Sequence, residues 1–417
     1  MREYLSHSLP YVPKLNNPEP PDAGLLSFGR KNMAIPGPSV IPERVLAAMA
    51  RPMVDIYAGE LVDASSEVFR RLPAIARTSG AVFAAVANGH GAWQMAINNT
   101  MSRGDKVLVL ESGRFATLWG EMAAKSGVEV EVLPGDDRSP VDPEALQARL
   151  EADTEREFKA VLTVQTDTAS SVINDIAALR DAIDAADHPA LFMVDCIASL
   201  CCEPFEMDLW GVDLTVGATQ KGLMVPPGLG FVWANEKALA AYRSAGLRSG
   251  YFEWDNRLEA RFHYELYAGT PPVSHIYALQ EALDMIDEQG GVERAWERHR
   301  LLASAVWAAV EAWSSDDGIE FNIIDPDHRS AAVSTVRTGS IPADELRSIC
   351  RYQAGLTLGV GIGGDSGQTF RIGHMGYLDP PAILGTIGTI EAALTTLGRA
   401  PAASGAAAAA ATLGGAF

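Results

Sequence analysis

Residues 212–234 read VDLTVGATQKGLMVPPGLGFVWA, and this stretch decides the fold. Two apolar runs, 212–218 and 229–234, flank a turn that contains Lys221. Short apolar runs bounded by turn residues predict buried strands. A lysine embedded between them indicates an amine whose pKa is lowered by burial, which suits attack on a carbonyl carbon. The alternative is a surface lysine that has only its aliphatic stem covered.

Upstream of this stretch, helical and strand patterns alternate. The runs AVLTVQ at 160–165 and LFMVD at 191–195 are also short and apolar, and helical patterns lie between several such runs. This alternation predicts an α/β fold with a mostly parallel sheet covered by helices on both faces. From about residue 275 long helical patterns precede short strands such as AAVSTVR at 331–337, which predicts a smaller α+β domain.

These patterns divide the chain into four segments. Residues 1–28 are rich in proline and predict an extended N-terminal arm. Residues 29–275 are expected to form the large domain, and residues 276–398 the small C-terminal domain. Residues 399–417 are rich in alanine and glycine, which predicts a low-complexity tail, either a frayed helix or a disordered segment.

Composition narrows the possible partners. The 417 residues include 33 Lys and Arg against 53 Asp and Glu, a net charge of −20, which disfavours binding to nucleic acid or to an anionic membrane surface. No apolar run reaches the roughly 20 residues of a membrane span. Adjacent Cys201 and Cys202 lack zinc-ligand spacing, so no metal site is expected, and the cysteines predict buried small hydrophobes. A cytoplasmic enzyme is the resulting expectation.

Besides Lys221, three features carry candidate chemistry because ligands bind at the carboxyl ends of strands in open α/β sheets. Asp195 ends an apolar run, which indicates a partly desolvated carboxylate with a partner, or else a turn residue. Gly89 and His90 open a helical pattern and could seat a phosphate, although His90 could merely cap the helix. Arg371, between apolar neighbours, is a candidate carboxylate ligand or a surface strand residue. The motif GVGIGG at 359–364 lacks the strand–helix context of a dinucleotide site.

Together, the segments VDCIAS around Asp195, TQKG around Lys221 and PPG at 226–228 resemble fold-type I pyridoxal-phosphate enzymes. The chain is most similar to class V aminotransferases of the alanine-, serine- and aspartate–glyoxylate type, from Pro36 to about residue 395. The resemblance implies a mixed, mostly parallel sheet in a large domain, and pyridoxal 5'-phosphate as cofactor. It also implies ping-pong transfer of an amino group from a small L-amino acid to glyoxylate or a similar 2-oxo acid.

The resemblance also assigns roles to individual residues. Lys221 matches the Schiff-base lysine, and Asp195 matches the carboxylate that pairs with the pyridine nitrogen. Arg371 matches the arginine that holds the substrate α-carboxylate. The other implied cofactor contacts are Gly89, His90 and Gln220 near the phosphate, Phe115 stacked on the ring, Thr168 near the phenolic oxygen, and Tyr267 and Thr270 from a neighbouring subunit. This last pair implies a homodimer with shared active sites.

Two segments depart from the family pattern. Residues 165–171 read QTDTASS where relatives usually have His-x-Glu-Thr, so Asp167 replaces a glutamate. Residues 54–61 read VDIYAGEL in place of an Asp-His-Arg stretch, which makes Tyr57 a candidate for the donor side of the substrate site.

Three alternatives remain open on the same fold. The segment FRIGHMG at 370–376 also resembles pyridoxamine–pyruvate aminotransferase, but that type has an acidic residue where this chain has His90. Cysteine desulfuration would use Cys350, which lies in a helical pattern, and desulfurases prefer histidine at the position of Phe115. A regulator without activity would not need to retain both Lys221 and Asp195.

Overall fold

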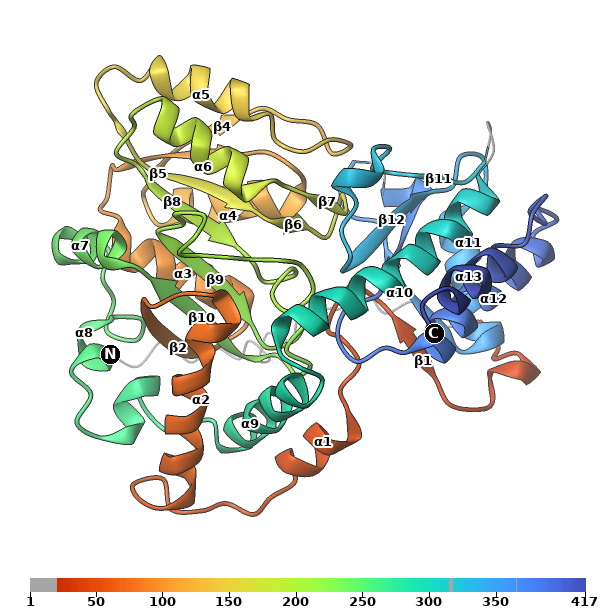
Figure 1. The fold of residues 1–417 in the computed structure, drawn as a ribbon, viewed down its shortest axis with the longest axis horizontal. Coiled ribbons are helices and arrows are strands. Elements are labelled where there is room, and N and C mark those ends of the chain that lie inside the picture. The colour runs from red at the N-terminus through yellow and green to blue at the C-terminus, as the bar shows by residue number, and fades with distance from the viewer. Residues whose placement is uncertain (1–20, 315–317, 365) are drawn as a thin grey trace, which may run out of the picture.

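The computed structural model describes residues 21–314, 318–364 and 366–417, and these ranges form a larger and a smaller part (Figure 1). The larger part contains a sheet with the strand order β2-β10-β9-β8-β5-β3-β4. Every neighbouring pair is parallel except those of β10, which is antiparallel to β2 and to β9. The strands are β2 (Ala81–Ala87), β3 (Lys106–Leu110), β4 (Glu129–Leu133), β5 (Phe158–Val164), β8 (Leu191–Asp195), β9 (Leu214–Ala218) and β10 (Gly228–Ala234). The predicted mixed, mostly parallel sheet is confirmed.

Residues 212–234 explain why β10 is antiparallel to its neighbours. Because β9 ends at Ala218 and β10 starts at Gly228, the connection is too short for a crossover helix, and the two strands pair antiparallel. The Thr219 hydroxyl donates to the Pro226 carbonyl at 2.8 Å and fixes this connection. Lys221 therefore lies in a constrained loop at the carboxyl end of β9.

Helices cover both faces of the large sheet, as the alternation predicts. Along β3, Val107 and Val109 belong to one core, whereas Leu108 and Leu110 belong to the other. One face carries α3 (Gly89–Thr100), α4 (Arg114–Lys125) and α7 (Glu236–Ser244). The other carries α2 (Glu60–Ala76), α5 (Pro143–Glu151), α6 (Ile176–Ala185) and α9 (Val273–Glu288). Shorter elements are α1 (Glu43–Met49), α8 (Asp255–Leu258) and the hairpin of β6 (Thr166–Asp167) and β7 (Val172–Ile173).

The smaller part contains a second sheet with the order β1-β13-β14-β12-β11. Its strands are β1 (Asn32–Ala34), β11 (Glu320–Phe321), β12 (Val333–Arg337), β13 (Leu356–Val360) and β14 (Thr369–Gly373), and its helices are α10 (Val292–Trp313), α11 (Ala343–Ser348), α12 (Pro380–Thr396) and α13 (Gly405–Gly414). β1 pairs parallel with β13, so a strand from the predicted large domain adds an edge to the small sheet. Of the predicted arm, residues 1–20 lie outside the described residues.

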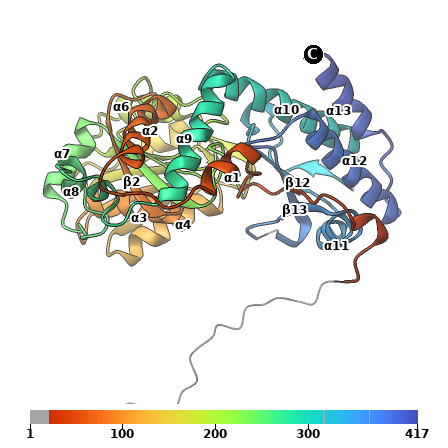
Figure 2. The same ribbon diagram turned by 90° about the horizontal axis from the view of Figure 1, so that it is seen from below.

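The alanine-rich C-terminal segment is a helix. Ser404 caps α13 by accepting a hydrogen bond from the Ala407 amide at 3.2 Å, and Ala409 and Leu413 are buried. The helix packs beside α10 and α12 (Figure 2). Of the two alternatives for the tail, a frayed helix or a disordered segment, the structure has a docked helix, because one alanine-rich face is apolar enough to be buried.

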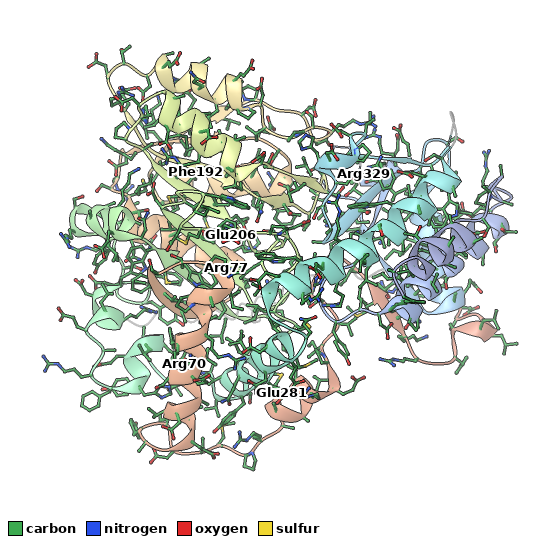
Figure 3. All side chains as sticks on the ribbon, viewed as in Figure 1. Arg70, Arg77, Phe192, Glu206, Glu281 and Arg329 are labelled. Carbon is green, nitrogen blue, oxygen red and sulfur yellow. The ribbon has the colours of Figure 1, made fainter. Side chains whose placement is uncertain are left out.

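Helix α10 begins beside the large sheet and continues along the small one (Figure 1). At its first turn Glu293 pairs with Arg77, the C-terminal cap residue of α2, which has a left-handed conformation. The Arg77 guanidinium also lies 3.9 Å from the Glu206 carboxylate, and both residues are labelled in Figure 3. Near its far end Glu311 accepts a hydrogen bond from Arg329 at 2.8 Å. No helix in the described ranges is both long enough and apolar enough to cross a membrane.

Candidate active site

A cavity of about 260 Å³ lies at the carboxyl ends of the central strands of the large sheet. It collects most of the residues predicted for the site: Gly89, His90, Phe115, Thr168, Asp195, Gln220 and Lys221. Gly37, Asn88, Trp93 and Thr166 also line it, and the sequence patterns did not single them out. In the described chain, the cavity is not lined by four of the predicted residues, which are Tyr57, Tyr267, Thr270 and Arg371.

Asp195 is a buried carboxylate with two hydrogen-bond donors. Its Oδ2 accepts from the Trp93 indole Nε1 at 2.8 Å, and its Oδ1 accepts from the Ile197 amide at 2.6 Å. Burial raises the pKa of Asp195 to about 7, and the two donors only partly oppose this shift. Of the two alternatives for Asp195, the structure has the partnered carboxylate at the end of β8.

Lys221 lines the same cavity as Asp195, and its amine is held by the segment around Pro36. Its Nζ donates to the Pro36 carbonyl. A Cβ at Gly37 would lie 2.5–2.6 Å from the end of the lysine side chain, and Gly37 has a φ of +86°, so only glycine fits there. Burial, followed by the nearby charge of Arg371, lowers the pKa of Lys221 to about 8. The alternative of a surface lysine is wrong.

The turn before α3 lies at a helix N-terminus on the cavity, and two of its amides already have an acceptor. The Asn88 side chain, and not His90, caps the helix, because Asn88 Oδ1 accepts from the amides of His90 at 3.1 Å and Gly91 at 3.3 Å. The His90 ring lies edge-on to Trp93, with 4.6 Å between ring centroids. Asn88 immediately before a helical pattern is a recognisable N-cap signal.

Arg371 reaches the same region from the small sheet. It lies on β14 and is 6% exposed, and its Nη1 donates to the Thr168 carbonyl at 2.8 Å. Its Nε donates to the Val360 carbonyl at 2.6 Å. Burial lowers the pKa of Arg371 to about 10. The alternative of a surface strand arginine is wrong, and the guanidinium lies at the junction between the two parts.

The remaining predicted residues lie away from the cavity. The Tyr267 ring is buried in its own chain, and its hydroxyl is 2.5 Å from the Ser65 hydroxyl, so this conformation does not present it to a neighbouring subunit. Thr270 is exposed. Tyr57 is 70% exposed and stands edge-on to Tyr264. The donor-side role of Tyr57 and the intersubunit role of Thr270 stay predictions.

Comparison with known proteins places these residues in a family. Residues 38–366 match the family model described as aminotransferase class-V. The chain is 36% identical over 374 residues to a serine–glyoxylate aminotransferase of Methylorubrum extorquens, covering 88% of this chain and 91% of that protein. It is 35% identical over 368 residues to an L-aspartate–glyoxylate aminotransferase of Paracoccus denitrificans, covering 87% and 91%.

Among solved structures, the ureidoglycine–glyoxylate aminotransferase of Bacillus subtilis is similar, with a TM-score of 0.84 and 25% identity over 94% of this chain and all of that one. The likeness extends over both sheets, and the resemblance to fold-type I enzymes is confirmed. A family match over most of the chain, together with a buried Asp195 and a shielded Lys221 on one cavity, leads to one conclusion: the chain is an enzyme of the class V aminotransferase family.

Proposed function

We propose that this enzyme uses pyridoxal 5'-phosphate to move the amino group of alanine, serine or aspartate to glyoxylate or a similar small 2-oxo acid. The single observation that carries this proposal is that the buried carboxylate of Asp195 and the shielded amine of Lys221 line the same cavity. The relatives are serine–glyoxylate and L-aspartate–glyoxylate aminotransferases, which supports the choice of substrates.

The residues around the cavity fit this cofactor. Gln220 offers a buried Oε1 that has no hydrogen-bond partner in the described chain, and it faces a cavity that a polar ligand would fill. The N-terminus of α3 at Gly89 and His90 suits the phosphate, Phe115 and Thr168 would contact the ring, and Asp195 would bind the pyridine nitrogen. When bound, pyridoxal phosphate supplies an electron sink for charge that develops at the substrate α-carbon.

Three side chains of the protein then have defined tasks. The Lys221 amine, with a pKa of about 8, is partly neutral near neutral pH, so its Nζ can accept the proton from the α-carbon of the amino acid. The Arg371 guanidinium would bind the substrate α-carboxylate, since a planar fork of donors matches two carboxylate oxygens. Asp195, kept from water by burial, holds a positive charge opposite it more strongly than an exposed carboxylate would.

We also propose a homodimer with a shared active site, to which exposed Thr270 contributes from the partner. Buried Tyr267 would need to leave its contact with Ser65 to contribute as well. The proposed division of the chain remains a large domain at 29–275 and a small one at 276–398, with β1 attached to the small sheet.

The purified chain tests the proposal. After incubation with pyridoxal 5'-phosphate and removal of excess ligand, it is expected to show a visible absorption band that the Lys221→Ala variant lacks. Lys159→Ala, at an exposed lysine, is the control and should keep the band. Adding serine, alanine or aspartate should bleach the band, and glyoxylate should restore it. A colourless wild-type protein would contradict the cofactor proposal.

The same experiment separates the two other reactions. Bleaching by cysteine alone with release of sulfide would favour desulfuration, and bleaching by none of the amino acids, with turnover of pyridoxamine and pyruvate, would favour the pyridoxamine reaction. The structure disfavours desulfuration, because Cys350 is buried and burial raises the pKa of its thiol to about 12. A thiol in this state is a poor nucleophile.

A further inference from the structure

Helix α4 begins without a cap from its own sequence. Its N-cap residue is Gly113, which has no side chain, so the first amides of the helix have no local acceptor. The acceptor comes from the β6–β7 hairpin, where the fully buried carboxylate of Asp167 lies. Its Oδ2 accepts from the amides of Phe115 at 2.8 Å and Ala116 at 3.0 Å. Asp167 is therefore a cap supplied from a distant segment.

The approach of this carboxylate depends on Gly113. A Cβ at that position would lie 2.5–2.8 Å from the carboxylate atoms of Asp167, and Gly113 has a φ of +153°. The other oxygen, Oδ1, accepts from the Ala169 amide at 2.9 Å and orders the turn that contains Thr168. Both oxygens of one buried carboxylate thus hold two different segments of the cavity wall.

Helix α4 carries two aromatic rings that matter for the site. Phe115 lines the cavity, and Trp119 stacks on Trp93 with 6.0 Å between ring centroids and 13° between ring planes. The indole N–H of Trp93 in turn donates a hydrogen bond to Asp195 at 2.8 Å. On the other side of Asp167, the Thr168 carbonyl accepts from Arg371. The position of α4 therefore affects both Phe115, which lines the cavity, and Trp93, which donates a hydrogen bond to Asp195.

We propose that Asp167 is a positioning residue. It fixes Phe115 and Trp119 of α4 relative to Thr168 and Arg371, and so shapes the cavity for the ring of the cofactor. This inference rests on the proposed function for the identity of the ligand. Three charge-assisted hydrogen bonds and the positive end of the α4 dipole stabilise the buried carboxylate at this point. Gly113 lets the backbone of α4 come close to the short side chain of Asp167.

The test is Asp167→Asn. An asparagine of the same shape has one acceptor oxygen, so it can serve the α4 amides or the Ala169 amide but not both. In the cofactor-free protein we expect protection of the Phe115 and Ala116 amides against hydrogen exchange to fall by about tenfold. The near-ultraviolet circular dichroism of the stacked Trp93 and Trp119 should change. The dissociation constant for pyridoxal phosphate should rise by about tenfold.

Asp175→Asn is the matched control. Asp175 caps α6 with a single oxygen, which accepts from the Ala178 amide at 3.0 Å, and asparagine can replace that contact. This variant should leave the amide protection in α4, the tryptophan signal and the cofactor affinity unchanged. If Asp167→Asn fails to fold, Gly113→Ala displaces the carboxylate while retaining its charge and should reduce the same amide protection.

A double-mutant cycle with Phe115→Leu separates positioning from general stability. If Asp167 acts through Phe115, the loss of cofactor affinity caused by Asp167→Asn should be clearly smaller in the Phe115→Leu background. Additive losses, or unchanged amide protection in a folded Asp167→Asn protein, would overturn the inference. If the wild type binds no pyridoxal phosphate, the proposed function fails, and the exchange and dichroism measurements on the cofactor-free protein still decide the role of Asp167.

Discussion

At the scale of single residues, burial sets the chemistry of Lys221 and Asp195. Opposite charges normally push the pKa of a lysine up and that of an aspartate down. Here burial outweighs that attraction, lowering the pKa of Lys221 to about 8 and raising that of Asp195 to about 7. Both groups are therefore poised to change charge near neutral pH, which is useful to an enzyme that moves protons.

Replacing Lys221 by methionine should stabilise the cofactor-free protein at neutral pH. The pKa of Lys221 in the folded protein lies below the usual 10.5, so burying the charged amine destabilises the folded state. This destabilisation is complete below about pH 8, where the amine is charged in both states, and it is lost as the pH rises to about 10.5. We expect Lys221→Met to raise the free energy of unfolding by about 2 kcal/mol at pH 7 and by little at pH 10. Denaturant titrations at the two pH values measure this, with exposed Lys159→Met as control. Equal gains at both pH values would contradict the mechanism.

At the scale of elements, the strands follow from local pattern and the C-terminal helix does not. The run 191–195 becomes β8, and most of the run 212–218 becomes β9, because short runs rich in apolar and β-branched residues suit a sheet that is covered on both faces. The alanine-rich segment has no such signal. Its helix α13 forms where a helical surface of α10 is available to cover it.

The docking of α13 can be tested at two of its glycines. A Cβ at Gly405 would lie 2.3 Å from the Trp313 indole nitrogen, whereas a Cβ at Gly414 would meet nothing within 4 Å. We therefore expect Gly405→Ala to lower the free energy of unfolding by about 1–3 kcal/mol through overpacking, and Gly414→Ala to leave it nearly unchanged. Urea titration of both variants measures the difference. Equal effects would indicate that α13 is not packed on Trp313.

At the scale of the whole molecule, a buried glutamate joins the two parts. Glu203, in the loop after β8, accepts hydrogen bonds from the Ser330 hydroxyl at 2.7 Å and from the Ala331 amide, both next to the small sheet. Burial raises the pKa of Glu203 to about 7. One of the acidic residues counted in the net charge of −20, Glu203, is therefore buried at the junction between the two parts and not exposed on the surface.

Glu203 should make stability depend on pH. The pKa of Glu203 in the folded protein is above the usual 4.5, so the folded state binds this proton more tightly than the unfolded state does. The stability that this protonation gives is complete below about pH 4.5 and is lost as the pH rises to about 7. We expect Glu203→Gln to match the wild type near pH 5 and to be more stable by about 2 kcal/mol at pH 8. Unfolding at both pH values measures this, with exposed Glu345→Gln as control. A variant less stable than the wild type at pH 8 would show that the charged form is needed at the junction.

Much of the site could be predicted because its motifs are local. Lys221 and Gln220 share one loop, Gly89 and His90 open one helix, and each was recognisable within a few residues of sequence. Asn88 could also have been found as a helix cap. Trp93 could not, because nothing in its helical pattern indicates that its indole reaches Asp195, 102 residues further along the chain.

The sequence by itself determined the alternation of strands and helices in the large domain, because hydrophobic periodicity and turn residues act over a few residues at a time. It also determined the family, through motifs around Lys221 and Asp195. Only the tertiary structure decided that β1 joins the small sheet, that Tyr267 turns into its own core, and that Asp167 caps a helix beginning 53 residues earlier. The physical reason is that such contacts depend on how distant segments pack, and many arrangements are compatible with the same local pattern.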